Sequence, residues 1–453
     1  MRSGVWEGRL VGIGQKYDLC GMTPSPSSIL WSSLLRSSAV VLALKVAGAL
    51  GSYAFVWVAV RQYGAAGYGR FELAFTFLSL LSVVAKWGYD GVLLRELPVQ
   101  SPSGSKALIR GVLGFTALFA AGLMLLLFAL RQPIAEFMHE PGLADELVWM
   151  SQALVPWTLF QVWAEHLRAR QKWVGYGLLQ SSVILGVAAL VIAWAPGGGS
   201  TSPAVYVYAV AAATLVVWIP HFLKGERQVG PVGWKESVQA LRSLSPSATA
   251  MFLTGILFMV MTWSDTLMVG YFLDAESVGL YRVAFKIATL ITFAQFAVNA
   301  QIAAQISAAW KVQDRVGLQS AVRRVALLNA LLGVPAFLVL TIWGDYFLSF
   351  FSENSSEMAA QLGLLRILCL GQIVNALCGP VMYLLNMTGH EGEARNTMTL
   401  AVVVNIVANA LLITSLGLEG AAWATTITMS LWNVWALVAV YRKTGIRTLI
   451  FWR

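Results

Sequence analysis

Long apolar runs, separated by short polar stretches, follow one another along almost the whole chain. Each run is long enough for a helix to cross a bilayer, which takes about 20 residues. A barrel would instead show segments of roughly ten residues that alternate between apolar and polar. The runs fall at 37–60, 71–94, 107–130, 147–166, 173–195, 203–223, 246–270, 278–307, 323–344, 361–386, 394–414 and 419–441. The pattern therefore predicts an all-α integral membrane protein with about 12 transmembrane helices.

Six runs precede the longest internal connection, at 224–245, and six follow it. This connection is too short for an inserted soluble domain, which takes at least about 50 residues. The expected organisation is a cytoplasmic N-terminal tail at 1–36, an N-terminal six-helix lobe at 37–223, a cytoplasmic linker at 224–245, a C-terminal six-helix lobe at 246–441 and a cytoplasmic tail at 442–453.

The composition agrees with a lipid environment. Of the 453 residues, 58% are hydrophobic and 12% are charged, and the mean hydropathy is +0.69, whereas soluble domains average roughly 25% charged residues. These values exclude a cytosolic enzyme, a secreted disulfide scaffold and a disordered regulator. The three cysteines form no disulfide framework, and the four histidines lack the spacing of metal ligands. We therefore expect neither a metal nor a cofactor.

The basic residues indicate which ends of the helices face the cytoplasm. With the N-terminus inside, 23 of the 31 Lys and Arg residues fall in cytoplasmic segments, 3 fall in outer segments and 5 lie within spans. The positive-inside rule therefore places both termini in the cytoplasm. The first 28 residues lack the short apolar run and cleavage site of a signal peptide, and translation starts at either Met1 or Met22.

A short repeat relates the two halves of the chain. The segment YGRFELAF at 68–75 returns as VGLYRVAF at 278–285, an offset of 210 residues. The glycine, an aromatic residue two positions later and the final Ala-Phe coincide, and both copies open the second helix of a six-helix set. Because six is even, both halves enter the membrane in the same direction. This predicts a pseudo-two-fold axis along the membrane normal and a central cavity between the lobes, as in transporters.

Five segments resemble a known family of transporters. They are GAAGYGRF at 64–71, SDTLMVGYF at 264–272, VGLY at 278–281, TGHE at 388–391 and LGLEGAA at 416–422. With these segments the chain is similar to the Wzx-type O-antigen and oligosaccharide flippases. These flippases are the polysaccharide-export branch of the multidrug/oligosaccharidyl-lipid/polysaccharide superfamily. The resemblance covers about residues 30–445; its motifs are structural and specify no substrate.

The resemblance implies two six-helix lobes around a central, often cationic cavity. It also implies movement of a polyprenyl-diphosphate-linked oligosaccharide from the inner to the outer leaflet of the bacterial cytoplasmic membrane, for surface polysaccharide biosynthesis. The implied partners are this lipid-linked oligosaccharide, membrane lipids and other polysaccharide-assembly membrane proteins, with no nucleic acid. The related lipid II flippases have two further helices, which this sequence lacks.

Five basic side chains fall inside the predicted spans, where an ionisable group costs roughly 2.5–3.5 kcal/mol on insertion scales. They are Lys45, Lys86, Arg282, Lys286 and Arg366. Arg and Lys form charge-assisted hydrogen bonds with phosphate oxygens. We therefore predict that these residues line a path for the diphosphate, and Lys45, which has no partner nearby in sequence, is the first candidate. Arg366 lies five residues inside its span and alternatively snorkels to the outer headgroups.

Two acidic residues within the spans, Asp90 and Asp265, are further candidates. Asp90 is four residues from Lys86, so the two either neutralise one another or leave Asp90 to carry a coupling ion. Asp265 either binds a coupling proton or sodium ion, or clamps the second lobe by pairing with Arg282 or Lys286. Both interpretations of each aspartate remain open.

Amide side chains within the spans are candidates for hydrogen bonds to sugars. They are Gln295, Asn299, Asn375, Asn405 and Asn409. Asn405 and Asn409 alternatively hold helices together, a common role of asparagine in membrane bundles.

Two other functions are weighed against a flippase. A cation-coupled multidrug antiporter of the same superfamily would have a cavity dominated by carboxylates, whereas basic residues outnumber acidic ones here. A membrane-bound polysaccharide polymerase or sugar-modifying enzyme would need convergent acid–base groups. The outer loop at 131–146 carries acidic residues but no recognisable nucleophile or metal spacing. We therefore do not expect an enzyme, and the absence of a GxxxxGK[ST] segment excludes ATP hydrolysis by a P-loop within this chain.

Overall fold

The computed structural model describes residues 26–449 except 99, 180, 196–201, 228–232, 352–357 and 359. All regular elements within this part of the chain are helices. They are α1 (Pro26–Lys86), α2 (Tyr89–Glu96), α3 (Pro102–Phe137), α4 (Leu143–Ala169), α5 (Trp173–Leu178), α6 (Ser181–Trp194), α7 (Pro203–Arg227), α8 (Trp234–Phe272), α9 (Ala275–Ala288), α10 (Leu290–Lys311), α11 (Arg315–Ile342), α12 (Gly344–Phe350), α14 (Leu362–Cys378), α15 (Val381–Met387), α16 (Glu391–Leu416) and α17 (Leu418–Thr444). Both candidate start positions lie outside the described residues.

Each predicted span coincides with one helix or with two in succession. The first two spans form α1, which breaks at Gly64 (φ 70°, ψ 176°), and α2 continues the second of them. The other spans match α3, α4, α5–α6, α7, α8, α9–α10, α11, α14–α15, α16 and α17. The segment expected as a linker, 224–245, is helical from Trp234 onward, because α8 begins there.

Seven described helices are long and apolar enough to cross a membrane, and α14 with α15, bent by 42°, makes an eighth. One of the seven is the part of α1 from Val46 to Lys86, which is a single helix in this count although its backbone breaks at Gly64. The spans outside this set, α4, α5–α6 and α9–α10, are interrupted or carry more polar residues.

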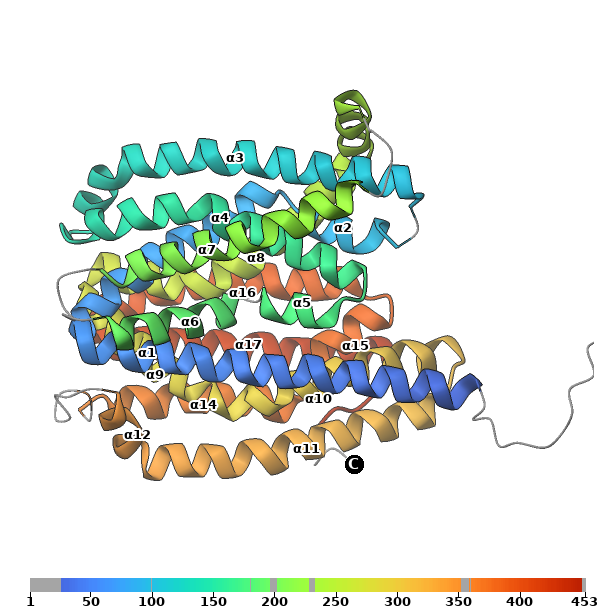
Figure 1. The fold of residues 1–453 in the computed structure, drawn as a ribbon. Helices are drawn as coiled ribbons and strands as arrows, with labels where there is room; N and C mark the ends of the chain where they lie inside the picture. The colour runs from blue at the N-terminus through green and yellow to red at the C-terminus, as the bar shows by residue number, and fades with distance from the viewer. Residues whose placement is uncertain are drawn as a thin grey trace, which may run out of the picture.

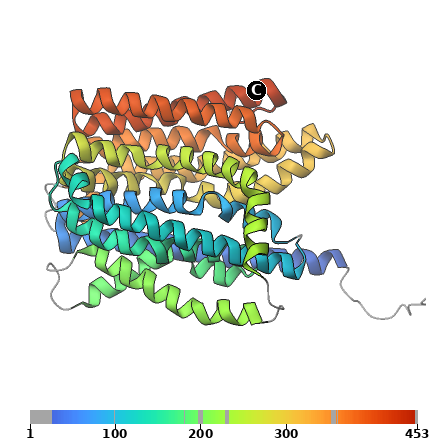
Figure 2. The same cartoon turned by 90° about the horizontal axis from the view of Figure 1, so that it is seen from above.

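The long helices run side by side along one common direction (Figure 1). Seen from above, the blue-to-green helices of the first half lie on one side and the yellow-to-red helices of the second half on the other (Figure 2). The start of α1 and the end of α17 lie toward the same end of the bundle (Figure 1). An even number of crossings produces this placement.

The lobes meet where the two copies of the repeat approach each other. A Cβ atom added to Gly69 would lie 1.6 Å from the carbonyl oxygen of Ala275, and one added to Gly279 would lie 2.0 Å from that of Ala65. Both glycines and both alanines are 210 residues apart, so the contact is reciprocal. A two-fold axis between α1 and α9 generates such a contact, and only glycine allows the backbones to come this close.

A second contact between the halves involves α8. The Trp87 ring stacks on Phe252 with centroids 4.4 Å apart, and Trp87 Nε1 donates to Thr249 Oγ1 over 3.2 Å. Gly88, in the left-handed region at φ 74°, lies against the backbone of Ala248. The first half of α8 therefore packs on the N-terminal helices, and its second half leads into the C-terminal lobe.

Candidate functional site

The interface between α1 and α9 holds a buried ion pair. Arg282 Nε donates to Glu72 Oε2 over 3.0 Å, and the two side chains are 15% and 9% exposed. The buried Tyr68 hydroxyl donates to the other oxygen of Glu72, Oε1, over 2.5 Å. Both carboxylate oxygens of Glu72 therefore accept a hydrogen bond, one from a donor in the N-terminal lobe and one from a donor in the C-terminal lobe.

Aromatic rings also cover the guanidinium group of Arg282. Its Cζ atom lies 4.5 Å from the centroid of the Trp263 ring and 5.8 Å from that of Phe285. A cation over a ring face is stabilised by the ring quadrupole, more so where water is excluded. Arg282 is thus held by one carboxylate from α1 and by rings from α8 and α9.

Lys286 lies one turn further along α9 and has no carboxylate partner among the described residues. Its Nζ donates to Ser52 Oγ over 2.7 Å and lies 5.1 Å from the centroid of the Tyr53 ring. Tyr53 in turn donates to the backbone oxygen of Lys286 over 3.0 Å. The partly buried ammonium group is therefore held by a neutral hydroxyl and a ring rather than by a carboxylate.

The C-terminal lobe encloses Asp265 in a fully polar shell. Its Oδ1 accepts from Asn405 Nδ2 over 2.9 Å and from Asn409 Nδ2 over 2.7 Å. Its Oδ2 accepts from Thr425 Oγ1 over 2.8 Å and from the Tyr281 hydroxyl over 3.2 Å. Four donors from α9, α16 and α17 thus surround one carboxylate on α8, and all five residues are buried.

This shell corrects one expectation and bears on a second. Within the described part of the chain, Asp265 pairs with neither Arg282 nor Lys286, so the proposed clamp is wrong: Arg282 turns to Glu72 and Lys286 to Ser52. Asn405 and Asn409 point to Asp265, and Asn405 also accepts from Ser264 Oγ over 2.6 Å. The two buried asparagines therefore join helices in this structure, as the alternative interpretation expected.

In the N-terminal lobe, Lys86 and Asp90 neutralise each other. Lys86 Nζ lies 2.9 Å from Asp90 Oδ2 and also donates to Gln161 Oε1 over 2.9 Å. The pair bridges the left-handed break at Trp87 and Gly88, so it joins the last residue of α1 to the start of α2. Lys86 and Asp90 are therefore each engaged in an ion pair with the other, which agrees with the interpretation that they neutralise one another.

The remaining predicted residues are spread over other parts of the fold. Arg366 is exposed and donates through Nε to the carbonyl oxygen of Thr341 over 2.9 Å, which agrees with the snorkelling alternative. Gln295 and Asn375 meet between α10 and α14, where Gln295 Nε2 lies 3.4 Å from the carbonyl oxygen of Asn375. The side chains of Lys45 and Asn299 lie outside the described residues.

The comparisons with known proteins agree with this architecture. A family model described as polysaccharide biosynthesis protein matches residues 58–358, well over half of the chain. The chain belongs to this family. The predicted resemblance to Wzx-type flippases is thereby confirmed at the level of the family.

Relatives of this chain include the probable low-salt glycan biosynthesis flippase Agl15 of Haloferax volcanii. It is 22% identical over 418 residues, which cover 88% of this chain and 81% of that protein. The structure of the lipid II flippase MurJ, in an inward closed conformation, has a TM-score of 0.68 at 14% identity and covers 90% of this chain and 87% of its own.

A multidrug resistance transporter of the MATE family and MOP superfamily, in an inward-facing conformation, has a similar fold. Its TM-score is 0.66 at 12% identity, with 90% of this chain and 99% of that chain covered. Together with MurJ, it confirms the predicted all-helical fold.

One residue central to the site, Glu72, is absent from the residues predicted from the sequence. It lies at the start of the second predicted span, two residues after Arg70. The repeat contained the missing signal, since Glu72 and Arg282 occupy the same position in its two copies. Two equivalent positions of opposite charge near a two-fold axis are candidates for a direct contact.

Proposed function

We propose that this protein is a flippase that carries a polyprenyl-diphosphate-linked oligosaccharide from the cytoplasmic to the outer leaflet, by alternating access, for surface polysaccharide biosynthesis. The proposal rests on the family and on the cations at the interface between the lobes. In this proposal the protein is a transporter and performs no bond-making step. It lies in the bacterial cytoplasmic membrane with both termini inside, and other assembly proteins supply and remove its substrate.

The pair of cations on α9 is the observation that carries the proposal. A diphosphate in an ester-linked carrier brings about two negative charges, and such charge does not enter a bilayer unaided. Lys286 has only a hydroxyl and a ring as partners, while Arg282 is held by one carboxylate. Both residues therefore offer charge-assisted hydrogen bonds to phosphate oxygens in a site of low dielectric constant.

Glu72 acts in this proposal as an internal substitute for the substrate. In the arrangement described here its carboxylate occupies Arg282. When the lobes separate, Glu72 leaves with α1 and Arg282 stays on α9, which frees the guanidinium group for a diphosphate oxygen. Arg282, Lys286 and, by its position on α1, Lys45 form the proposed path, and Lys86 lies in a neutral pair outside its centre.

Asp265 is the proposed site of a coupling ion. Sodium prefers oxygen ligands, as hard cations do, and the carboxylate is surrounded by hydroxyl and amide groups from three other helices. Asn409 Oδ1 is buried and has no hydrogen-bond partner among the described residues, so one acceptor remains for a cation. A proton on Asp265 is the alternative coupling ion.

A cation-coupled multidrug antiporter is the second candidate, favoured by the MATE-like fold and by the carboxylate of Asp265. The two functions differ in which charges contact the cargo. A flippase for a diphosphate needs Arg282 and Lys286, whereas an antiporter for cationic drugs needs a carboxylate in the cavity and is hindered by these cations.

The test replaces Arg282 and Lys286 singly with Ala and with the other basic residue, Arg282→Lys and Lys286→Arg. Surface polysaccharide and lipid-linked intermediate retained on the cytoplasmic side are measured in cells that lack the chromosomal copy. We expect the Ala variants to lose surface polysaccharide and accumulate the intermediate, and the basic variants to retain more activity. Arg366→Ala, which removes an exposed arginine, is the matched control.

Normal transport by both Ala variants at wild-type abundance would overturn the proposal. Export of cationic drugs by the wild type, with loss of export in Asp265→Asn and not in Lys286→Ala, would establish the antiporter instead.

A further inference from the structure

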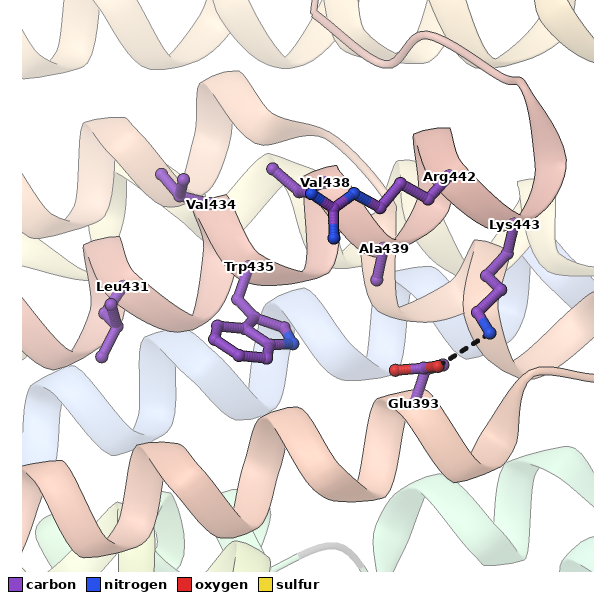
Figure 3. Close-up of a pocket in the computed structure, with 8 residues that line it drawn as sticks. All are labelled: Glu393, Leu431, Val434, Trp435, Val438, Ala439, Arg442 and Lys443. Atoms are coloured by element: carbon purple, nitrogen blue, oxygen red, sulfur yellow. Dashed lines mark ion pairs between the residues drawn. The ribbon is translucent and has the colours of Figure 1, made fainter.

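A hollow of about 630 Å³ lies on α16 and α17, outside the interface between the lobes. It is lined by Glu393, Leu431, Val434, Trp435, Val438, Ala439, Arg442 and Lys443 (Figure 3). Only Glu393 comes from α16, and the other residues come from the last four turns of α17. The hollow is therefore an open groove along one helix, closed at one end by charge.

The apolar part of this groove follows a single stripe of α17. Leu431, Trp435, Val438 and Arg442 are spaced by four, three and four residues, which places them on one face of a helix. Leu431, Trp435 and Val438 are each more than a third exposed, although they are large and apolar. From Leu431 to Arg442 the helix rises about 16 Å. This length equals the hydrocarbon depth of one leaflet, about 15 Å.

The charged end of the groove carries one surplus positive charge. Lys443 Nζ lies 3.1 Å from Glu393 Oε1, so these two groups neutralise each other. Arg442 is exposed and has no ion pair or hydrogen bond to another described residue. Its side chain runs back along α17 toward Val438, so the guanidinium group lies beside the apolar stripe (Figure 3).

We propose that this groove is a binding site for one anionic glycerophospholipid of the cytoplasmic leaflet, with the phosphate at Arg442 and an acyl chain along Val438, Trp435 and Leu431. The dimensions fit one leaflet, and the surplus charge of +1 fits a phosphodiester whose headgroup adds no cation. A basic pocket beside a transmembrane helix on the cytoplasmic side is a setting in which anionic lipids bind. A zwitterionic lipid would bring its own ammonium group close to Arg442, and the repulsion between the two cations would weaken its binding.

The proposal is tested with the full-length protein by native mass spectrometry from detergent, titrated with phosphatidylglycerol or phosphatidylcholine. We expect one phosphatidylglycerol to bind more tightly than phosphatidylcholine, and Arg442→Gln to weaken its binding about tenfold, the loss of one charge-assisted hydrogen bond. Val438→Trp fills the apolar stripe without changing the charge and should weaken binding as well. Glu393→Gln removes the competing anion and should strengthen binding about threefold.

Arg324→Ala is the matched control, since it removes an exposed arginine of α11 that does not line the groove. An equal loss of binding in Arg324→Ala and Arg442→Gln would mean unspecific attraction and would overturn the proposal. Unchanged binding in Val438→Trp, or equal binding of both lipids, would also overturn it. A competition with a polyprenyl diphosphate gives a further test. If this compound displaced phosphatidylglycerol from the wild type but not from Arg442→Gln, the groove would bind the carrier, and the proposal would be overturned. A dimer that buries α17 would exclude a lipid there.

Discussion

Glu72 and Arg282 form an ion pair across the two lobes, and they are 210 residues apart, the offset that relates the two copies of the repeat. Each residue therefore occupies in its own lobe the position that its partner occupies in the other. A two-fold axis brings equivalent positions together only where it passes between them. The pair and the adjacent approach of Gly69 and Gly279 thus mark the axis. The lobes cannot separate at this end of the bundle without breaking the pair.

We expect Glu72→Gln to favour separation of the lobes at this end. The substitution leaves the buried guanidinium group of Arg282 without its counter-charge, and removing one partner of a buried pair costs about 3–5 kcal/mol. Spin labels at Arg61 and Phe272, one exposed residue from each lobe near this end, report the distance between the lobes. The distribution should broaden toward longer distances in Glu72→Gln.

The double variant Glu72→Arg with Arg282→Glu is the control, because it exchanges the two charges across the axis. It should return the distribution toward the wild type. Identical distributions in Glu72→Gln and the wild type would show that the pair does not hold the lobes together.

We expect Gly69→Ala to impair transport more than any exposed substitution of similar size. The new Cβ atom would lie 1.6 Å from the carbonyl oxygen of Ala275, so α1 and α9 must move apart. Overpacking of this kind costs about 1–3 kcal/mol. Gly122→Ala is the matched control, since nothing lies within 4 Å of the added Cβ atom. Surface polysaccharide, normalised to protein abundance, is the measurement, and equal output from the two variants contradicts the prediction.

We expect sodium to stabilise the wild-type protein through Asp265. A ligand that binds only the folded state adds about 2.7 kcal/mol at 100 times its dissociation constant. The melting temperature in detergent should therefore rise by a few degrees when sodium chloride replaces potassium chloride. Asp265→Asn should abolish this difference while Asp90→Asn, with its carboxylate in a local pair, retains it. A difference that persists in Asp265→Asn would place the ion elsewhere.

We expect Lys86 and Asp90 to act as a structural pair. Removing either charge alone leaves the other partly buried, whereas Lys86→Gln with Asp90→Asn removes both. The double variant should therefore be more stable than the two single effects predict, by a coupling energy of about 0.5–3 kcal/mol. It should also transport nearly as the wild type does. Melting temperatures test the coupling energy, and surface polysaccharide tests transport. Loss of transport in a well-folded double variant would mean that Lys86 contacts the substrate.

The features that were predicted correctly from the sequence are those set by residues close together along the chain. The helices followed from hydropathy, because the bilayer demands about 20 apolar residues for each crossing. The pair of Lys86 and Asp90 was predicted from their spacing of four residues, and it forms although the helix breaks between them. The shell of Asp265 did not follow: its partner Asn405 is 140 residues away on another helix. Spacing along one helix contains no information about such a contact.

The amino-acid sequence by itself therefore determined that this protein is a bundle of membrane helices in two related halves, with several cations inside the helices. Hydropathy and the distribution of charge act on each helix separately, so they can be read from one chain. Only the tertiary structure decided that Glu72 meets Arg282, that Lys286 has no acidic partner in the described part of the chain, and that Asp265 is enclosed by amides and hydroxyls. These contacts depend on how far each helix is rotated about its own axis, and that rotation is set by the packing of all neighbouring helices.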